Sequence, residues 1–359
     1  MLCMKINFLL FLMAVVFSCS NSTVMNSKWE VVKGEGIDPE NKLFYFLSFP
    51  QKDYGLMFGS SYSDESLLKK AFTNFNAIYY FSNDGGLNWI EKGLGKGKFS
   101  SYTTKNNYVF LCKELKGDEV KPDSAVIYFS NNYGETFKEC AFFIDFYIRN
   151  VFVKSESEMY VIGKQGNVNY WMIKSSFDGG KTWTDIGKLD NDLQSPIIVD
   201  HNILYLTKSN NKNFIKKISL ISGTLSEVQL PSQISNSYFV TSYANNLFIM
   251  GSSEGNLFIY KLIGNHFIEF SKFLSIDKFP VHMEIRHDSI YLILGERNSI
   301  GVTYSLYSKG LSLSSWDVTS IPSSNFSPFA FSESAIWGYS LDGQFYKKTL
   351  LSFVISANP

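Results

Sequence analysis

The chain has 359 residues, no formal net charge and 16% aromatic residues. Because its lysines and arginines are not gathered into a basic stretch, it lacks the positively charged surface that nucleic-acid-binding proteins need, and nucleic acid is not an expected partner. After residue 27 no apolar run approaches the roughly 20 residues that a membrane-spanning helix requires. The remaining length, residues 28–359, suits one large domain.

The N-terminus has the features of an export signal. Lys5 supplies a basic start, and an apolar run of about ten residues follows from Phe8 to Phe17. Ser18 and Cys19 end this run, and they resemble a bacterial lipobox, in which the cysteine becomes the lipidated first residue of the mature protein. The alternative is an ordinary cleaved signal in which Cys19 is incidental.

The lipobox resemblance implies that residues 1–18 form the signal peptide, that Cys19 carries the lipid and that residues 19–27 form a short polar tether. Ser20 follows the cysteine, and a residue other than aspartate at this place implies the outer membrane where a cell has two. We therefore expect an exported protein, lipid-anchored at the bacterial cell envelope. Its contact with the membrane would be through the lipid only.

A short sequence pattern occurs three times in the first half of the chain. The pattern is Ser-x-Asp-x-Gly-x-x-Trp, and its copies begin at Ser82, Ser130 and Ser176, which are 48 and then 46 residues apart. A repeat of this length predicts a solenoid or a propeller. The second copy has asparagine and phenylalanine in place of aspartate and tryptophan. The residues concerned are Ser82, Asp84, Gly86, Trp89, Ser130, Asn132, Gly134, Phe137, Ser176, Asp178, Gly180 and Trp183.

The residue types of this pattern fit a tight turn between two antiparallel strands. A short aspartate or asparagine side chain accepts hydrogen bonds from nearby backbone N–H groups, and glycine supplies a positive φ angle. The following aromatic residue anchors the turn on apolar surface. Each copy also follows a strand-like run, at Ala77–Phe81, Ala125–Phe129 and Tyr170–Ile173.

The pattern resembles the Asp-box, or BNR, repeat of sialidases and many other β-propellers. The resemblance implies that each copy lies at the turn between the third and fourth strands of a blade. It also implies that the copies lie on the side away from the usual ligand site, so that their residues are structural.

We predict an all-β fold, a single β-propeller of seven four-stranded antiparallel blades. Trp29–Gly34 resembles the strand that follows a repeat turn, and we expect it to become the outer strand of the last blade, pairing near Gln344–Leu350 and closing the ring. The units cover about residues 42–92, 99–146, 149–188, 196–230, 238–270, 281–321 and 329–355.

Most motifs of catalysis and cofactor binding are missing. No His-Glu-x-x-His, Cys-x-x-Cys, Gly-x-Ser-x-Gly or P-loop pattern occurs, so no metal and no cofactor is predicted. Gly93–Lys98 is rich in glycine but lacks the spacing of a phosphate-binding loop, and we interpret it as a connection between blades. Cys112 and Cys140 fall on the second and fourth strands of one blade, about 9.6 Å apart, which favours two buried free thiols.

The Asp-box resemblance raises the question of sialidase activity. In that family three arginines surround the substrate carboxylate, a tyrosine nucleophile pairs with a glutamate, and an aspartate acts as acid and base. This chain has three arginines, Arg149, Arg286 and Arg297, and none lies near the N-terminus in the family's Arg-Ile-Pro context. A sialidase-like, glycan-active hydrolase is therefore the alternative to a non-catalytic protein.

One cluster of charged residues stands out on a strand of the sixth unit. Alternation places His282, Glu284 and Arg286 on one face of this strand, which would be innermost and line the central channel. One interpretation is a ligand site in which Arg286 meets an anionic or sugar group. The other is a pair between Glu284 and Arg286 that satisfies itself.

Two long insertions, at 61–76 and 113–123, are predicted on the face opposite the repeat turns, and the first contains a candidate short helix at Glu65–Phe72, capped by Ser63 or Asp64. Loops on such a face often carry function. The favoured hypothesis is a non-catalytic envelope lipoprotein whose propeller presents a binding face for a protein, peptide or glycan.

Overall fold

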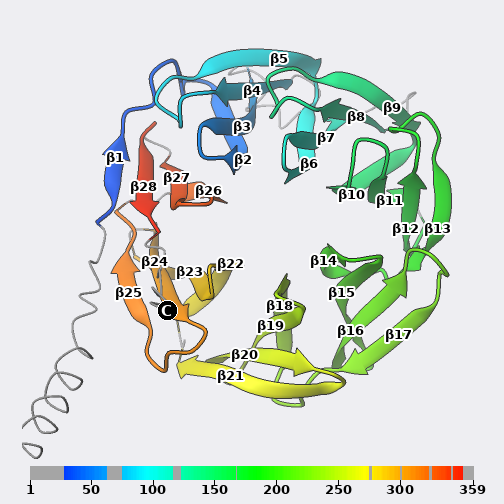
Figure 1. Cartoon of the computed structure of the whole chain (residues 1–359), viewed down its shortest axis with the longest axis vertical. Coiled ribbons are helices and arrows are strands. Elements are labelled where there is room, and N and C mark those ends of the chain that lie inside the picture. Colours follow the sequence, from blue (N-terminus) through cyan, green and yellow to red (C-terminus); the bar gives the residue numbers. More distant parts are fainter. Residues whose placement is uncertain are drawn as a thin grey trace, which may run out of the picture.

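The structure is a computed structural model, and it describes residues 28–62, 75–115, 123–166, 168–274, 277–299, 301–322, 326–340 and 343–350. Across these residues the regular elements are β-strands, which form seven antiparallel sheets of four strands each. The sheets are arranged as blades around a central opening (Figure 1). The predicted all-β, seven-bladed propeller is confirmed. Within the described ranges, no helix is long and apolar enough to cross a membrane.

In blades 1 to 4 the strands follow chain order from the innermost to the outermost. Blade 1 comprises β2 (Lys42–Gln51), β3 (Tyr54–Ser61), β4 (Asn76–Ser82) and β5 (Ile90–Lys96); blade 2, β6 (Lys98–Lys105), β7 (Tyr108–Leu115), β8 (Ser124–Ser130) and β9 (Lys138–Ile144); blade 3, β10 (Phe146–Val153), β11 (Met159–Gln165), β12 (Trp171–Ser176) and β13 (Thr184–Leu189); blade 4, β14 (Gln194–Val199), β15 (Asn202–Ser209), β16 (Lys212–Ser219) and β17 (Leu225–Gln229).

Blades 5 and 6 keep this order, whereas blade 7 combines three C-terminal strands with the first strand of the chain. Blade 5 comprises β18 (Asn236–Tyr243), β19 (Asn246–Ser253), β20 (Asn256–Ile263) and β21 (His266–Leu274); blade 6, β22 (Lys278–Arg286), β23 (Ser289–Asn298), β24 (Gly301–Gly310) and β25 (Asp317–Ser320); blade 7, β26 (Phe326–Phe331), β27 (Ala335–Ser340), β28 (Phe345–Thr349) and β1 (Glu30–Val32).

The apolar core lies between neighbouring blades. Middle strands are covered on both faces, so β4 is buried without a break from Ala77 to Ser82. Between blades 1 and 2, Leu56 and Phe58 of β3 pack with Val109 and Leu111 of β7. Because each interface buries apolar surface from two blades, the hydrophobic effect stabilises the ring and not only the single blades.

The seventh blade joins the two ends of the chain. β1 pairs antiparallel with β28, with Glu30 opposite Lys347 and Val32 opposite Phe345, as predicted for the closing strand. Trp89, which follows the first repeat turn in blade 1, stacks on Phe345 of blade 7, with ring centroids 5.0 Å apart and planes inclined by 3°. Backbone pairing and aromatic stacking therefore close the ring at the same place.

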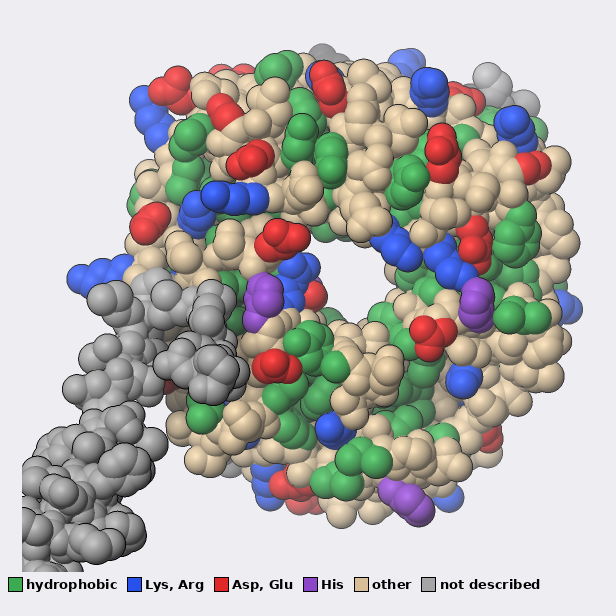
Figure 2. Space-filling model, in the orientation of Figure 1, with side chains coloured by type: hydrophobic (Ala, Val, Ile, Leu, Met, Phe, Trp, Pro, Cys, Tyr) green, Lys and Arg blue, Asp and Glu red, His purple; other side chains and the backbone are tan. Residues whose placement is uncertain are grey.

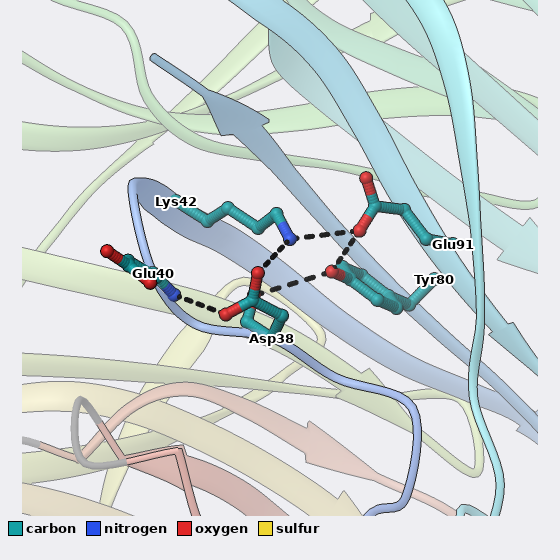
Figure 3. A network of polar contacts seen from close by, with 5 residues as sticks. All are labelled: Asp38, Glu40, Lys42, Tyr80 and Glu91. Atoms are coloured by element: carbon teal, nitrogen blue, oxygen red, sulfur yellow. Dashed lines mark hydrogen bonds and ion pairs between the residues drawn. The ribbon is translucent and has the colours of Figure 1, made fainter. Parts of the chain in front are cut away.

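A polar network holds the connection after β1 against blade 1 (Figure 3). Lys42 Nζ lies 3.0 Å from a carboxylate oxygen of Glu91 and 3.4 Å from one of Asp38, and the Tyr80 hydroxyl donates to Glu91. Burial alone would lower the pKa of Lys42, but the hydrogen bonds and charges of Tyr80 and Glu91 outweigh it and raise that pKa. The ammonium group therefore stays charged at neutral pH and fixes the segment that carries β1.

The repeated turns lie between the third and fourth strands of blades 1, 2 and 3. In the first, Ser82 Oγ accepts from Gly86 N at 2.9 Å, and Asp84 Oδ1 accepts from Leu87 N and Asn88 N at 3.1 and 3.0 Å. The glycine has a φ of 87°, and Trp89 Nε1 donates to its carbonyl oxygen at 2.9 Å. In all three copies the serine Oγ accepts from the glycine N–H.

Two predicted boundaries are wrong. Gly93–Lys98, interpreted as a loop, belongs almost wholly to strands, because β5 continues to Lys96, β6 begins at Lys98 and only Gly97 lies between them. Gly97 N–H donates to the Phe75 carbonyl at 2.8 Å, and its φ is 119°. Tertiary pairing therefore overrides the glycine content. Phe146 begins the third blade and does not end the second.

Several predictions fall outside the described residues. These include the signal and tether at 1–27 with Cys19, the candidate helix at Glu65–Phe72 with its caps, and residues 116–122 of the second insertion. Ser61 belongs to β3, and residues 113–115 belong to β7.

The two body cysteines are free thiols, as predicted; Cys112 is buried, whereas Cys140 is only partly buried. Cys112 lies on β7 and Cys140 on β9, with β8 between them in the sheet. Burial raises the pKa of each thiol to about 12, so neither forms a reactive thiolate at neutral pH.

Closure predicts a large effect of one aromatic side chain. Trp89 is 4% exposed, and Trp89→Ala should lower the free energy of unfolding by about 3–5 kcal/mol, the usual range for deleting a buried aromatic residue. The neighbouring change Ile90→Ala, at a side chain that is 57% exposed, is the matched control. Denaturant unfolding of the full chain measures both, and equal midpoints for the two variants would contradict this account of closure.

The repeat turn of blade 3 predicts a pH-dependent effect. Hydrogen bonds from the Thr182 side chain and backbone hold the pKa of Asp178 at about 2, below its ordinary value of 3.8. A carboxylate with a depressed folded-state pKa stabilises the fold above its unfolded pKa, and the effect is lost as pH falls through the folded value. Asp178→Ala should therefore lower the melting temperature at pH 7, with a difference from the parent that shrinks between about pH 4 and pH 2.

Asp53→Ala is the control for this prediction, because Asp53 is an exposed turn residue of the same face and its side chain makes no hydrogen bond within the described ranges. The interpretation of Asp178 as a turn-former fails if Asp178→Ala melts like the parent at pH 7.

Candidate functional site

The two faces of the ring carry different connections. The repeat turns share one face, here called the repeat face, with the turns between first and second strands. The other face, here called the loop face, carries the connections between second and third strands and those between blades. This assignment follows from the alternation of antiparallel strands in each sheet.

The predicted cluster on β22 is assembled at the central opening. Arg286 Nε lies 3.0 Å from one carboxylate oxygen of Glu284, and His282 Nε2 lies 3.5 Å from the other. The His282 ring stacks on Phe331 of blade 7, with centroids 5.1 Å apart. Figure 2 shows the opening running through the ring, with acidic, basic and histidine side chains gathered on the side where Figure 1 places β22 and β26.

The charges of this cluster compensate one another. Burial opposes ionisation of Glu284, but His282 and Arg286 outweigh it and lower the pKa of the Glu284 carboxyl. His282 Nε2 lies 3.5 Å from the second carboxylate oxygen and makes no hydrogen bond within the described ranges. The arrangement therefore contains a satisfied Glu284–Arg286 pair, and it does not leave a free arginine for a ligand.

The three arginines do not converge. Arg149 lies on β10 in blade 3, whereas the other two belong to blade 6. Within blade 6, Arg286 pairs opposite Ser289 beside the repeat-face turn, and Arg297 pairs opposite Val302 at the other end of β23. A sialidase-type clamp of three arginines around one carboxylate is therefore not formed.

A pocket of about 270 Å³ opens on the loop face between blades 2 and 3. Its walls come from strand ends of both blades: Lys98, Glu114, Leu115, Asp123, Ser124, Phe146 and Tyr147. Glu114 was not predicted as a site residue, and neither was Tyr147. The sequence signal that could have indicated this pocket is the charged start of the second predicted insertion, where Lys113 and Glu114 follow an apolar run.

Glu114 gives the pocket its electrostatic character. Burial raises the pKa of this carboxyl, Asp123 adds to the rise, and Lys98 opposes it. Lys98 Nζ lies 3.5 Å from Glu114 Oε2, while Glu114 Oε1 is buried and has no hydrogen-bond partner within the described ranges. An unsatisfied buried oxygen of this kind can accept a hydrogen bond from a ligand.

Tyr147 forms the exposed wall of the pocket. Its side chain is 48% exposed, and its ring lies 6.0 Å from that of Trp171 on β12. Burial raises the pKa of the Tyr147 hydroxyl and Glu114 raises it further, against the effect of Arg149. The hydroxyl is therefore a neutral hydrogen-bonding group at physiological pH.

No cluster of three or more metal-ligating side chains occurs within the described ranges.

Comparison with known proteins gives the fold but no family. No protein-family model matches the chain, and no curated protein sequence matches it. Among solved structures, YCF48 bound to a D1 peptide is similar with a TM-score of 0.60 and 12% identity, over 90% of this chain and 97% of that one.

The propeller domain of a protease and part of a peptidase are also similar. The propeller domain of the Trilobed protease from Pyrococcus furiosus, which has an open velcro topology, gives a TM-score of 0.59 at 10% identity over 90% of this chain and 100% of that one. An acylaminoacyl peptidase from Pyrococcus horikoshii gives 0.56 at 12% identity, and the match covers 86% of this chain but 51% of the peptidase. At these identities the comparison shows the fold alone.

The channel cluster predicts energetic coupling between its members. In a double-mutant cycle of Glu284→Gln and Arg286→Met, the two stability changes should depart from additivity by about 0.5–3 kcal/mol, because each change removes the 3.0 Å ion pair between the two side chains. The pKa of Glu284 is lowered, so the coupling should be full above the ordinary value of 4.5 and should fall as pH drops through the folded value. Additive changes at pH 7 would contradict the pairing.

Proposed function

We propose that this chain is a non-catalytic binding protein of the bacterial cell envelope, whose propeller presents its loop face to a segment of another protein. One observation carries the proposal: the pocket between blades 2 and 3 and the exposed Tyr147 lie together on the face that the repeat turns do not use. Tyrosine is among the side chains that contribute most to protein interfaces.

The pocket is of a size to hold one side chain of a peptide and is too small to enclose a whole small-molecule ligand. A volume of about 270 Å³ lies just below the roughly 300–1,000 Å³ of pockets that enclose whole small ligands. It suits one side chain of a peptide, with Phe146 and Leu115 offering apolar contact and Glu114 Oε1 accepting a hydrogen bond. The rest of the peptide would then lie across the open face.

Some of the structural neighbours support a peptide as the class of partner. YCF48 was solved with a bound peptide, and two other similar structures are the propeller domain of a protease and a peptidase. These likenesses share the fold at low identity, so they support the class of partner and do not identify it.

The envelope part of the proposal rests on the sequence. It includes removal of residues 1–18, lipidation of Cys19 and anchoring at the outer membrane, with residues 19–27 as the tether. A separate part of the proposal assigns the three repeat turns to the Asp-box type, since their serine, glycine and aspartate or asparagine residues make the hydrogen bonds that such a turn requires.

A glycan-active hydrolase is the second candidate, because Glu114 and Asp123 line one pocket and glycosidases use two carboxyl groups. The separated arginines argue against a sialidase-type clamp. Hydrolysis of a fluorogenic glycoside by the purified chain, abolished by Glu114→Gln, would favour this candidate over the binding protein.

Peptide binding can be tested by selecting peptides from a displayed random library on the detergent-solubilised full chain. We expect Tyr147→Ala to weaken binding of a selected synthetic peptide at least about tenfold, because truncation removes an aromatic contact at the pocket wall. Phe177→Ala is the matched control, since Phe177 is 64% exposed but lies in a repeat turn. Fluorescence anisotropy with labelled peptide measures both affinities.

Equal weakening by Tyr147→Ala and Phe177→Ala would show that the peptide does not bind at the pocket between blades 2 and 3. Failure to select any peptide would overturn the proposed function. A melting temperature equal to that of the parent confirms that Tyr147→Ala remains folded.

A further inference from the structure

Arg149 occupies a special position in the backbone of the ring. In every blade the pairing of the innermost strand with the second strand shifts register near the loop face. Such bulges re-aim side chains and are frequent beside functional sites. At each shift one or two residues of the innermost strand have no pairing partner on the second strand. Arg149 is the charged residue among them. The unpaired residues are Tyr45, Ser100, Arg149, Ser195 with Pro196, Tyr238, Val281, and Ser327 with Pro328.

Arg149 lies over an aromatic ring and has no counter-charge among the residues that the structure describes. Its guanidinium carbon is 5.1 Å from the ring centroid of Trp171, and it forms no ion pair within the described ranges. This contrasts with Arg286, which is paired with Glu284 at 3.0 Å. Burial lowers the pKa of Arg149, as expected for a half-buried cation without a carboxylate beside it.

A second cation shares the same ring. Lys164 Nζ lies 4.6 Å from the Trp171 centroid, and it donates to the Asn191 side chain. Register explains the meeting, because Lys164 pairs opposite Tyr147 and Gly163 opposite Met172, so that Tyr147, Lys164 and Trp171 follow one another across β10, β11 and β12.

The acidic residues of the neighbouring connection are engaged elsewhere. Asp190 lies 3.0 Å from Lys216 Nζ and accepts from the Tyr205 hydroxyl at 2.9 Å, and Asp192 accepts from Thr207 and the Lys208 backbone. Neither carboxylate neutralises Arg149 or Lys164, so two positive charges gather at one indole ring.

We propose that Arg149 and Lys164, held over Trp171, form a binding site for a carboxylate side chain of an acidic peptide. This inference rests on the proposed function and specifies the peptide: it should carry aspartate or glutamate beside the residue that enters the pocket. Tyr147 connects the two places, since it lines the pocket and contacts Trp171. A carboxylate here accepts charge-assisted hydrogen bonds and relieves the repulsion between the two cations.

The composition of the selected peptides and their response to charge removal test this site. We expect enrichment in aspartate and glutamate, and at least about tenfold weaker binding when each acidic residue of a selected peptide is replaced by its amide or when Arg149→Met is introduced. Lys164→Gln should weaken binding in the same direction. Arg297→Met is the matched control, because Arg297 also lies over an aromatic ring, that of Phe279 at 5.7 Å, and it should leave affinity unchanged.

The outcomes separate the two proposals. Selected peptides without acidic residues, or acidic peptides that bind Arg149→Met and Lys164→Gln as tightly as the parent, would overturn the carboxylate site and leave peptide binding standing. Absence of any bound peptide would overturn both. On a glycan array, Arg149-dependent binding of acidic sugars without peptide binding would replace the peptide by a glycan. Thermal melting of each variant confirms that lost affinity is not lost folding.

Discussion

Closure of the ring is the constraint on which the other features of this structure depend. Each blade buries apolar side chains against both neighbours, so an open ring would leave two blade faces exposed to water. The chain meets this requirement by pairing β1 with β28 and by stacking Trp89 on Phe345. The stacked tryptophan also belongs to a repeat turn, so the residue that completes a local turn in blade 1 holds the last blade in place.

The repeat turns and the chemically active groups are separated by face. On the repeat face, the serine and the aspartate or asparagine of each repeat turn bond to groups of the same turn, so their hydrogen bonds stabilise the turn. The connections on the loop face share no such repeated sequence pattern. Glu114, Tyr147 and Arg149 all lie towards that face, on strands whose positions are fixed by the core below them. A rigid ring thereby supports a variable surface.

Sequence predicted the features that depend on neighbouring residues. Eight consecutive residues, Ser176–Trp183, determine the turn around Asp178. The closing strand at Trp29–Gly34 resembles in sequence the strand that begins at Trp89. The pocket was not predictable, because Glu114 and Tyr147 come from different blades and meet only through strand register. Gly93–Lys98 was misread for the same reason, since its glycines suggest a loop while pairing with β4 makes it strand.

The arginines show why a sequence pattern and a functional charge need not coincide. Alternation made His282, Glu284 and Arg286 conspicuous, but the same alternation places opposite charges side by side, where they neutralise one another. The sequence around Arg149 shows no motif, and it does not indicate the register shift between Ile148 and Asn150 that leaves Arg149 without a pairing partner. Among the described residues it has no ion-pair partner, which becomes visible once the neighbouring carboxylates of Asp190 and Asp192 are seen to be engaged. A charge that the fold leaves uncompensated is a better guide to binding than a charge that the sequence makes prominent.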